Sequence, residues 1–257
     1  MVLDGLQWLG HHSLRQLGFV GRMGLFLGTM LGGALTPPWK VGRCLQRLQF
    51  VGAKSVLLIV LTGAFTGMVL ALQGFYALNR FGSDAFLGPL VALSLVRELG
   101  PVLAALMVTG RAGSAMAAEI GIMRIGEQLD AMEMMGLNPS RYVVVPNLFA
   151  AVLAMPLLAA IFNVVGIWGG YLIGVGTLGV SGGTYVAETA QYLQWRDILG
   201  GIWKSLTFGV IIAWVCCYKG YHAGFGAEGV SRATTEAVVL SSVLILVWDY
   251  FMTAALF

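Results

Sequence analysis

A stretch of 46 residues without a charged side chain constrains the fold of this chain more than any other feature. It lies between Arg141 and Glu188 and runs from Tyr142 to Ala187. A helix needs about 20 apolar residues, at about 1.5 Å each, to cross a bilayer. The whole chain of 257 residues is 58% hydrophobic and only 11% charged, whereas soluble domains are about one-quarter charged. The sequence therefore predicts an all-α integral membrane protein with no separate soluble domain.

Five segments have the length and composition of transmembrane helices. They comprise residues 55–75, 85–118, 142–177, 198–218 and 237–257 of a predicted membrane domain, 55–257. Residues 1–54 form a predicted N-terminal cytoplasmic or interfacial region. Within it, Leu17–Leu35 contains Arg22 and precedes a basic cluster, which favours an amphipathic interfacial (elbow) helix. A sixth span is the alternative for this segment.

The positions of Lys and Arg predict the orientation in the membrane. With five spans, one face of the membrane collects Arg15, Arg22, Lys40, Arg43, Arg47, Lys54, Arg111, Arg124, Arg141, Lys219 and Arg232. The other face has only Arg80 and Arg196. Because positive residues accumulate in cytoplasmic loops, we expect a cytoplasmic N-terminus and a C-terminus on the outer side.

Motifs for catalysis, nucleotide binding and metal binding are missing from the sequence. It has no HExxH, GxSxG or GxxxxGK[ST] pattern. The cysteines Cys44, Cys216 and Cys217 match neither a disulfide framework nor zinc spacing. We therefore expect a protein that is not an enzyme and has no metal or cofactor of its own. Any driven work would take its energy from another subunit.

Four ionisable residues lie inside the predicted spans. They are Arg97, Glu98, Lys204 and Asp249. Charges at membrane depth are costly, so they should face a cavity or one another. All four fall in the outer half of the membrane or near its midplane, which favours a polar patch in a cavity open to the outer side. Structural salt bridges that fix helix packing are the alternative.

Proline and glycine modify the predicted helices. Pro101 cannot donate a backbone hydrogen bond, so the carbonyl near Arg97 should lose its partner and the helix should kink. Pro156 offers a similar break in the third span. The small-residue steps GAFTG and GIWGG, which begin at Gly63 and Gly166, allow close helix approach. We expect them to pack within one subunit rather than between two.

The connection after the second span predicts a short amphipathic helix at about residues 125–136. Its apolar side carries Leu129, Met132 and Met135, and its acidic side carries Glu127, Asp130 and Glu133. Gly136 and Pro139 should end it. An acidic cytoplasmic helix with Met-rich apolar positions suits docking to a partner. An ordinary capped loop helix is the alternative.

The sequence LVRELGPVLAALMVTGRAGSAMAAEIGIMRIGEQLDAMEMMGLNP, which begins at Leu95, closely resembles the signature of the MlaE/YrbE family. These proteins are permease subunits of bacterial lipid ABC transporters that work with MCE-domain proteins. RELGPV, GRAGSA, AAEIG and EQLDAM occur in the family's order and spacing. The one mild departure is MEMMG, where many members have a run with fewer methionines.

This resemblance implies a function and partners. It implies a homodimer in the inner membrane of a Gram-negative bacterium that moves phospholipid to or from a periplasmic carrier and maintains outer-membrane lipid asymmetry. It also implies an ABC ATPase that binds ATP and Mg²⁺, a periplasmic hexameric MCE protein, and a STAS-domain protein on the ATPase. An ion-coupled secondary transporter and a non-transporting membrane anchor are the alternative functions.

The family resemblance and the buried charges together suggest residue roles. Arg97 and Lys204 are predicted to meet the lipid phosphate, while Glu98 and Asp249 hold these cations in an empty cavity. Leu70, Leu78 and Leu99 are predicted to contact acyl chains. The predicted ATPase-coupling residues are Glu127, Gln128, Leu129, Asp130, Met132 and Glu133.

Overall fold

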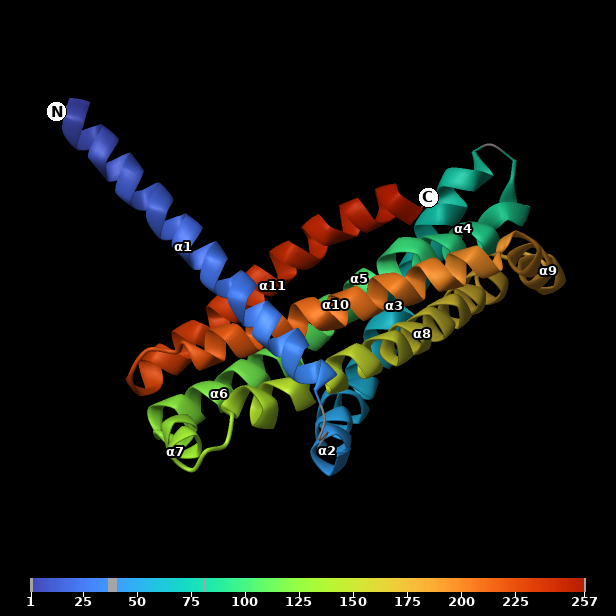
Figure 1. The fold of residues 1–257 in the computed structure, drawn as a ribbon. Helices are drawn as coiled ribbons and strands as arrows, with labels where there is room; N and C mark the ends of the chain where they lie inside the picture. Colours follow the sequence, from blue (N-terminus) through green and yellow to red (C-terminus); the bar gives the residue numbers. More distant parts are fainter. Residues whose placement is uncertain (1, 37–40, 81, 257) are drawn as a thin grey trace.

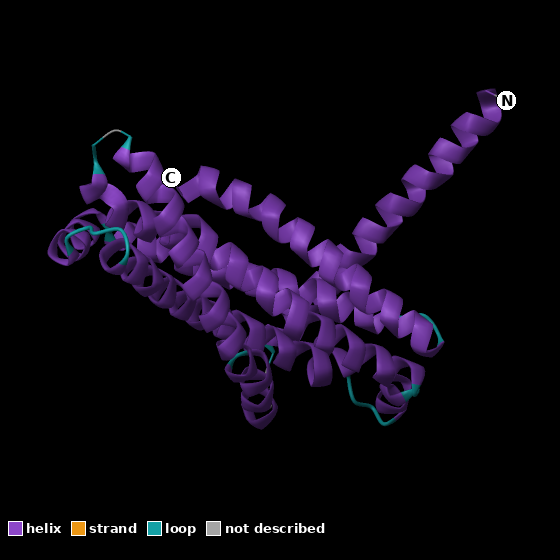
Figure 2. Cartoon of the chain, turned by 180° about the vertical axis from the view of Figure 1, so that it is seen from behind, coloured by secondary structure: helices purple, strands orange, loops and turns teal. Residues whose placement is uncertain are grey.

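The computed structural model describes residues 2–36, 41–80 and 82–256, with the side chains of 2–13, 15 and 16 left out. Lys40 and the side chain of Arg15, both used to orient the chain, therefore lie outside the described part. Every regular element in that part is helical (Figure 2), which confirms the all-α class. A membrane favours this class because a helix pairs its own backbone polar groups.

The helices follow one another closely along the chain (Figure 1). The first half comprises α1 Val2–Leu35, α2 Val41–Val51, η1 Ala53–Ser55, α3 Val56–Asn79, η2 Asp84–Phe86, α4 Leu87–Ser94, η3 Leu95–Leu99, α5 Gly100–Val108, η4 Thr109–Gly113 and α6 Ser114–Ile125. The second half comprises α7 Gln128–Met134, η5 Ser140–Val144, α8 Val145–Gly176, α9 Gly182–Tyr192, α10 Trp195–Tyr221 and α11 Gly226–Leu256. Of these, η3, η4 and η5 are π-helical turns.

Six described segments are long and apolar enough to cross a bilayer. They are residues 17–35, 41–79, 84–125, 140–176, 195–221 and 226–256. Each of the five predicted spans corresponds to one of the last five segments; the third runs one residue past its segment, to residue 177, and residue 257 lies outside the described part. The first segment is the least buried of the six, and the N-terminal half of α1 projects away from the bundle in both views (Figures 1 and 2). An interfacial position for α1 stays a prediction.

Some observed helix bounds differ from the predicted ones. The last span begins at Gly226 rather than at residue 237, so the helix has about three additional polar turns. An i,i+4 ion pair between Arg232 and Glu236 supports them. The loop helix covers only Gln128–Met134, because Glu127 adopts a positive φ of 54° just before it. Gly136, with a φ of 74°, follows its end as predicted.

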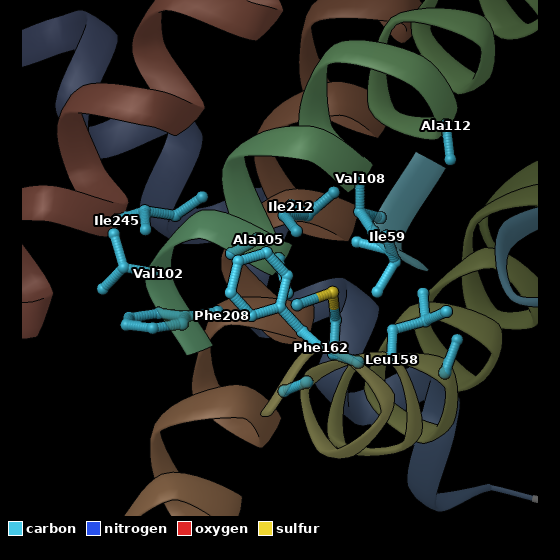
Figure 3. Close-up of a cluster of buried hydrophobic side chains, with 14 of the residues drawn as sticks. Ile59, Val102, Ala105, Val108, Ala112, Leu158, Phe162, Phe208, Ile212 and Ile245 are labelled. Atoms are coloured by element: carbon cyan, nitrogen blue, oxygen red, sulfur yellow. The ribbon is translucent and has the colours of Figure 1, made fainter. Parts of the chain in front are cut away.

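The core is formed by the tight packing of α3 and α8. A Cβ atom added at Gly67 would lie 1.8 Å from the carbonyl oxygen of Gly166, and one at Gly169 would lie 2.6 Å from that of Ala64. The GAFTG and GIWGG steps therefore pack against each other within one subunit, as predicted. Aromatic and branched side chains such as Phe162, Phe208 and Ile59 fill the adjoining space between the helices (Figure 3).

The bundle has two distinguishable ends (Figure 1). The α7 end holds α7 and the connection between α10 and α11. The α9 end holds α9, the η2 turn and the C-terminus of α11. Pro156 does not break the chain between them, because α8 continues through it from Val145 to Gly176. The predicted break at Pro156 is therefore wrong: residues on both sides keep helical hydrogen bonding.

Candidate functional site

A cluster of charged side chains lies inside the bundle, in the half near the α9 end. The Lys204 ammonium group donates hydrogen bonds to Oε2 of Glu98 at 2.6 Å and to the Thr253 hydroxyl at 2.7 Å. It also forms an ion pair with Oδ1 of Asp249 at 3.0 Å. We call Lys204, Glu98, Asp249 and Thr253 the Lys204 cluster. It joins η3, α10 and α11, and it brings together three of the four residues predicted to share one depth.

Pro101 leaves the Arg97 carbonyl without its usual helical donor, and Lys204 supplies a replacement. In a regular helix, the amide of residue 101 would donate to the carbonyl of Arg97, but proline has no such hydrogen. That carbonyl oxygen instead accepts a hydrogen bond of 3.0 Å from the Lys204 ammonium group. Leu95–Leu99 forms a π-helical turn just before the proline. The predicted loss of the carbonyl's helical partner is thus confirmed, and a side chain from α10 replaces that partner.

Arg97 pairs with a carboxylate that is neither of the two predicted, Glu98 and Asp249. Its Nε donates to Oδ1 of Asp197 at 2.8 Å. Asp197 is buried, and its Oδ2 accepts a hydrogen bond of 3.0 Å from the Gln194 amide. Gln194 and Asp197 together form a capping box that starts α10. Asp197 was not among the predicted site residues, although the Q-x-x-D spacing before an apolar run indicates a helix cap.

The charged residues differ in their exposure. The Lys204 side chain is fully buried, whereas those of Arg97 and Glu98 are 39% and 37% exposed. The Lys204 ammonium group already has four oxygen partners. For Lys204, these contacts favour the alternative prediction of structural salt bridges that fix helix packing. Arg97 and Glu98 are the most exposed of the charged groups predicted for this region.

The predicted coupling helix lies at the other end of the bundle. On α7, the carboxylate of Asp130 pairs with Nη1 of Arg124 at 2.5 Å, and Glu133 accepts a 3.2 Å hydrogen bond from the Tyr221 hydroxyl. Leu129 is buried, whereas Met134 is 90% exposed. These contacts fix α7 against α6 and α10 and leave an apolar side chain and partly exposed acids at its surface.

One continuous helical segment connects the two regions. Residues 84–125 contain η3 with Arg97 and Glu98, then η4, then α6, which ends just before α7. Along this segment, Arg111 donates to the Phe50 carbonyl at 2.8 Å and to the Ser55 hydroxyl at 2.7 Å. Glu119 accepts two hydrogen bonds from Arg47 of α2. The segment is therefore held to the α2–η1 region at two points.

Comparison with protein families identifies the chain. The family model described as "Permease MlaE" matches residues 44–255. The chain belongs to the MlaE permease family. A relative from Haemophilus influenzae, named intermembrane phospholipid transport system permease protein MlaE, is 40% identical over 100% of this chain and 99% of its own length. A probable ABC transporter permease protein of Rickettsia typhi is 41% identical with the same coverage.

A more distant relative matches a part of this chain. The chloroplastic protein TRIGALACTOSYLDIACYLGLYCEROL 1 of Arabidopsis thaliana is 35% identical over 83% of this chain and 61% of its own length. MlaE membership confirms the family resemblance read from the RELGPV to EQLDAM stretch. It also confirms that the chain is a permease rather than an enzyme.

The three leucines predicted to contact acyl chains are half-buried in the main core of this MlaE chain. Leu70 and Leu78 lie on α3, and Leu99 lies at the end of η3. The contacts described for the Lys204 cluster do not include Leu70 or Leu78. Their role in lipid binding therefore stays a prediction.

Proposed function

We propose that this chain is the membrane subunit of an ABC transporter that moves phospholipid between the inner membrane and a periplasmic carrier. The observation that carries the proposal is the full-length, 40% identity to the Haemophilus permease whose name states intermembrane phospholipid transport. The proposed role includes maintaining the lipid asymmetry of the outer membrane of a Gram-negative bacterium. The N-terminus is on the cytoplasmic side and the C-terminus is periplasmic.

The proposed lipid site uses the exposed part of the charged region. Arg97 meets the lipid phosphate, because a guanidinium group pairs well with a phosphate and its side chain remains 39% exposed. Glu98 and Asp249 hold Lys204 in the bundle, and Lys204 supports the backbone at Arg97. Leu70, Leu78 and Leu99 line the path of the acyl chains. A structural change caused by lipid binding at Arg97 is then transmitted to α7 through the helical segment 84–125.

The proposed assembly follows from the family. Two copies of the chain form the membrane unit, and each α7 docks on one ABC ATPase subunit that binds ATP and Mg²⁺. Exposed Met134, together with the acidic residues of α7, supports this docking surface. A hexameric MCE protein lies on the periplasmic side and a STAS-domain protein lies on the ATPase. Residues 1–54 form the interfacial region and 55–257 the transmembrane unit.

Reconstitution tests this function. The purified complex in liposomes should transfer a labelled phospholipid to or from the soluble MCE protein only when ATP is hydrolysed. An ATPase subunit with an inactivated nucleotide site should abolish the transfer. Transfer by the permease alone, driven by an ion gradient, would instead establish the ion-coupled transporter. A complex that assembles but transfers no lipid under either condition would establish the membrane anchor.

For the lipid site, Arg97→Gln should reduce transfer strongly while the complex still assembles. The control is Lys54→Gln, which removes a cation in η1 and outside the residues of the proposed site. Equal transfer by the two variants would show that Arg97 does not hold the phosphate.

A further inference from the structure

A charged cavity lies at the α7 end of the bundle, far from the Lys204 cluster. It has a volume of about 560 Å³ and lies between α1, the end of α10 and the start of α11. We call it the α1–α10–α11 pocket. Phe19, Tyr218 and His222 supply its aromatic walls, and Arg22, Lys219 and Arg232 supply cations. Along α10, Lys219 follows Lys204 by fifteen residues, which is about 22 Å of helix.

The charges of the pocket leave hydrogen-bond donors for an anion. Three cations face two carboxylates, Glu228 and Glu236. Glu236 accepts hydrogen bonds from Lys219 at 2.8 Å and from Nε of Arg232 at 2.9 Å. A guanidinium group has five N–H donors, and the described hydrogen bond of Arg232 uses one of them. The Arg232 side chain is 81% exposed, so its other donors are accessible.

A separate apolar groove lies along the same three helices. It has a volume of about 360 Å³ and is lined by Leu27 of α1, Trp214 of α10, and Leu244 and Trp248 of α11. Leu27 lies about 12 Å along α1 from Phe19, and Leu244 lies about 12 Å along α11 from Glu236. The charged pocket lies at the helix ends and the groove lies deeper in the bundle. The cationic pocket and the apolar groove together complement an amphiphile that has an anionic head and apolar tails.

The level of the pocket along the helices supports a membrane lipid as the ligand. The candidate spans 195–221 and 226–256 end and begin at this pocket, so it lies where a bilayer presents its headgroups. Basic pockets between helices on the cytoplasmic side bind anionic headgroups. Trp214, which lies about 10 Å along α10 from Tyr221, is of a residue type that favours the region just below the headgroups.

We propose that the α1–α10–α11 pocket binds the phosphate group of a phospholipid from the leaflet at the α7 end. Lys219, Arg232 and Arg22 contact the phosphate, and the acyl chains follow the groove beside Trp214. This site is separate from Arg97 and does not depend on the proposed transport function. Glu236 competes with the phosphate for Lys219 and Arg232 in the unoccupied pocket.

Photolabelling of the full-length protein in lipid nanodiscs tests this site. The probe is phosphatidylglycerol with a photoactivatable group in one acyl chain, and mass spectrometry locates the labelled peptides. Label should appear on the Trp214 region of α10 and the Leu244 region of α11. Lys219→Gln should reduce this label about tenfold, because a charge-assisted hydrogen bond to the phosphate is lost. Lys54→Gln, which removes a cation outside the pocket, should leave the label unchanged.

The Glu236→Gln variant distinguishes a role of the pocket in lipid binding from a purely structural role of the Lys219–Glu236 pair. This substitution removes the competing carboxylate, so it should increase the label, whereas a merely structural role for the Lys219–Glu236 pair predicts a decrease in both variants. Equal loss in Lys219→Gln and Glu236→Gln would overturn the proposal. Equal labelling by a photoactivatable diacylglycerol, which has no phosphate, would also overturn it.

A competition experiment distinguishes lipid phosphate from soluble phosphate. Millimolar glycerol 3-phosphate should not displace the phosphatidylglycerol label, because it lacks the acyl chains that occupy the groove. Displacement by glycerol 3-phosphate or inorganic phosphate would keep the anion site but overturn its assignment to a membrane lipid.

Discussion

The Lys204 ammonium group lies 2.6 Å from Oε2 of Glu98, although the two residues are 106 positions apart in the chain. The same ammonium group caps the Arg97 carbonyl that Pro101 leaves without a backbone donor. A buried lysine therefore stabilises the π-helical turn that holds Arg97 and Glu98 at a partly exposed position. The structural role of Lys204 and the proposed lipid role of Arg97 are linked through one backbone carbonyl.

Replacing Lys204 should destabilise the protein strongly. Lys204→Met leaves Glu98 and Asp249 without their shared cation and leaves the Arg97 carbonyl without a donor. Removing one partner of a buried ion pair costs about 3–5 kcal/mol. We expect a clearly lower thermal unfolding midpoint in detergent, measured by intrinsic tryptophan fluorescence.

A second substitution provides the control for Lys204. Lys204→Met combined with Asp249→Asn removes one of the two stranded carboxylates, so it should recover part of the lost stability. A double variant as unstable as the sum of the two single variants would show that Lys204 and Asp249 act independently.

Asp197 should contribute through both of its oxygens. Oδ1 accepts from Arg97 and Oδ2 accepts from the Gln194 amide. Asp197→Asn keeps one oxygen for the amide but loses the charge, whereas Asp197→Ala loses both contacts. Loss of a helix N-terminal cap costs about 1 kcal/mol, so Ala should lower the unfolding midpoint more than Asn. Equal unfolding midpoints for Asp197→Asn and Asp197→Ala would show that the hydrogen bond to the Gln194 amide does not contribute to stability.

Part of this site was predictable from the sequence, for physical reasons. Charges are costly in a membrane, so the four ionisable residues in apolar segments had to converge, and three of them do. The pairing was not predictable, because it depends on how α10 and η3 face each other. Asp197 lies at the start of a helix, where a polar residue has an ordinary local explanation, and its contact with Arg97 spans 100 positions.

The close approach of α3 and α8 should tolerate no side chain at Gly67. A Cβ atom there would lie 1.8 Å from the Gly166 carbonyl oxygen, so Gly67→Ala must push the two helices apart. The matched control is Gly110→Ala, because a Cβ at Gly110 meets nothing within 4 Å. We expect a lower unfolding midpoint and poorer yield for Gly67→Ala only. Equal behaviour of the two variants would contradict the observed helix spacing.

The helical class was predictable because long uncharged apolar segments can cross a bilayer only as helices. The glycine contacts were predictable because small residues at four-residue spacing create a flat helix surface. The extent of α11 was less predictable. Glu228, Arg232 and Glu236 look like loop residues in a hydropathy pattern, yet the Arg232–Glu236 pair lies on the helix. Polar helical turns beyond a bilayer carry no apolar signal, so only the side-chain spacing indicates them.

Asp130 tests the proposed docking of α7 on the ATPase. Asp130→Lys should reduce co-purification of the ATPase, because it reverses a charge on the docking surface. Asp130 also pairs with Arg124 at 2.5 Å, so the substitution also places two cations side by side and disturbs the loop.

The charge swap Arg124→Asp with Asp130→Lys restores the pair while keeping the charge at position 130 reversed. Co-purification should stay low in the swap variant if Asp130 contacts the ATPase directly. Full recovery would assign Asp130 to holding α7 in place, and Glu127 or Glu133 would then be the next acidic residues to test by co-purification.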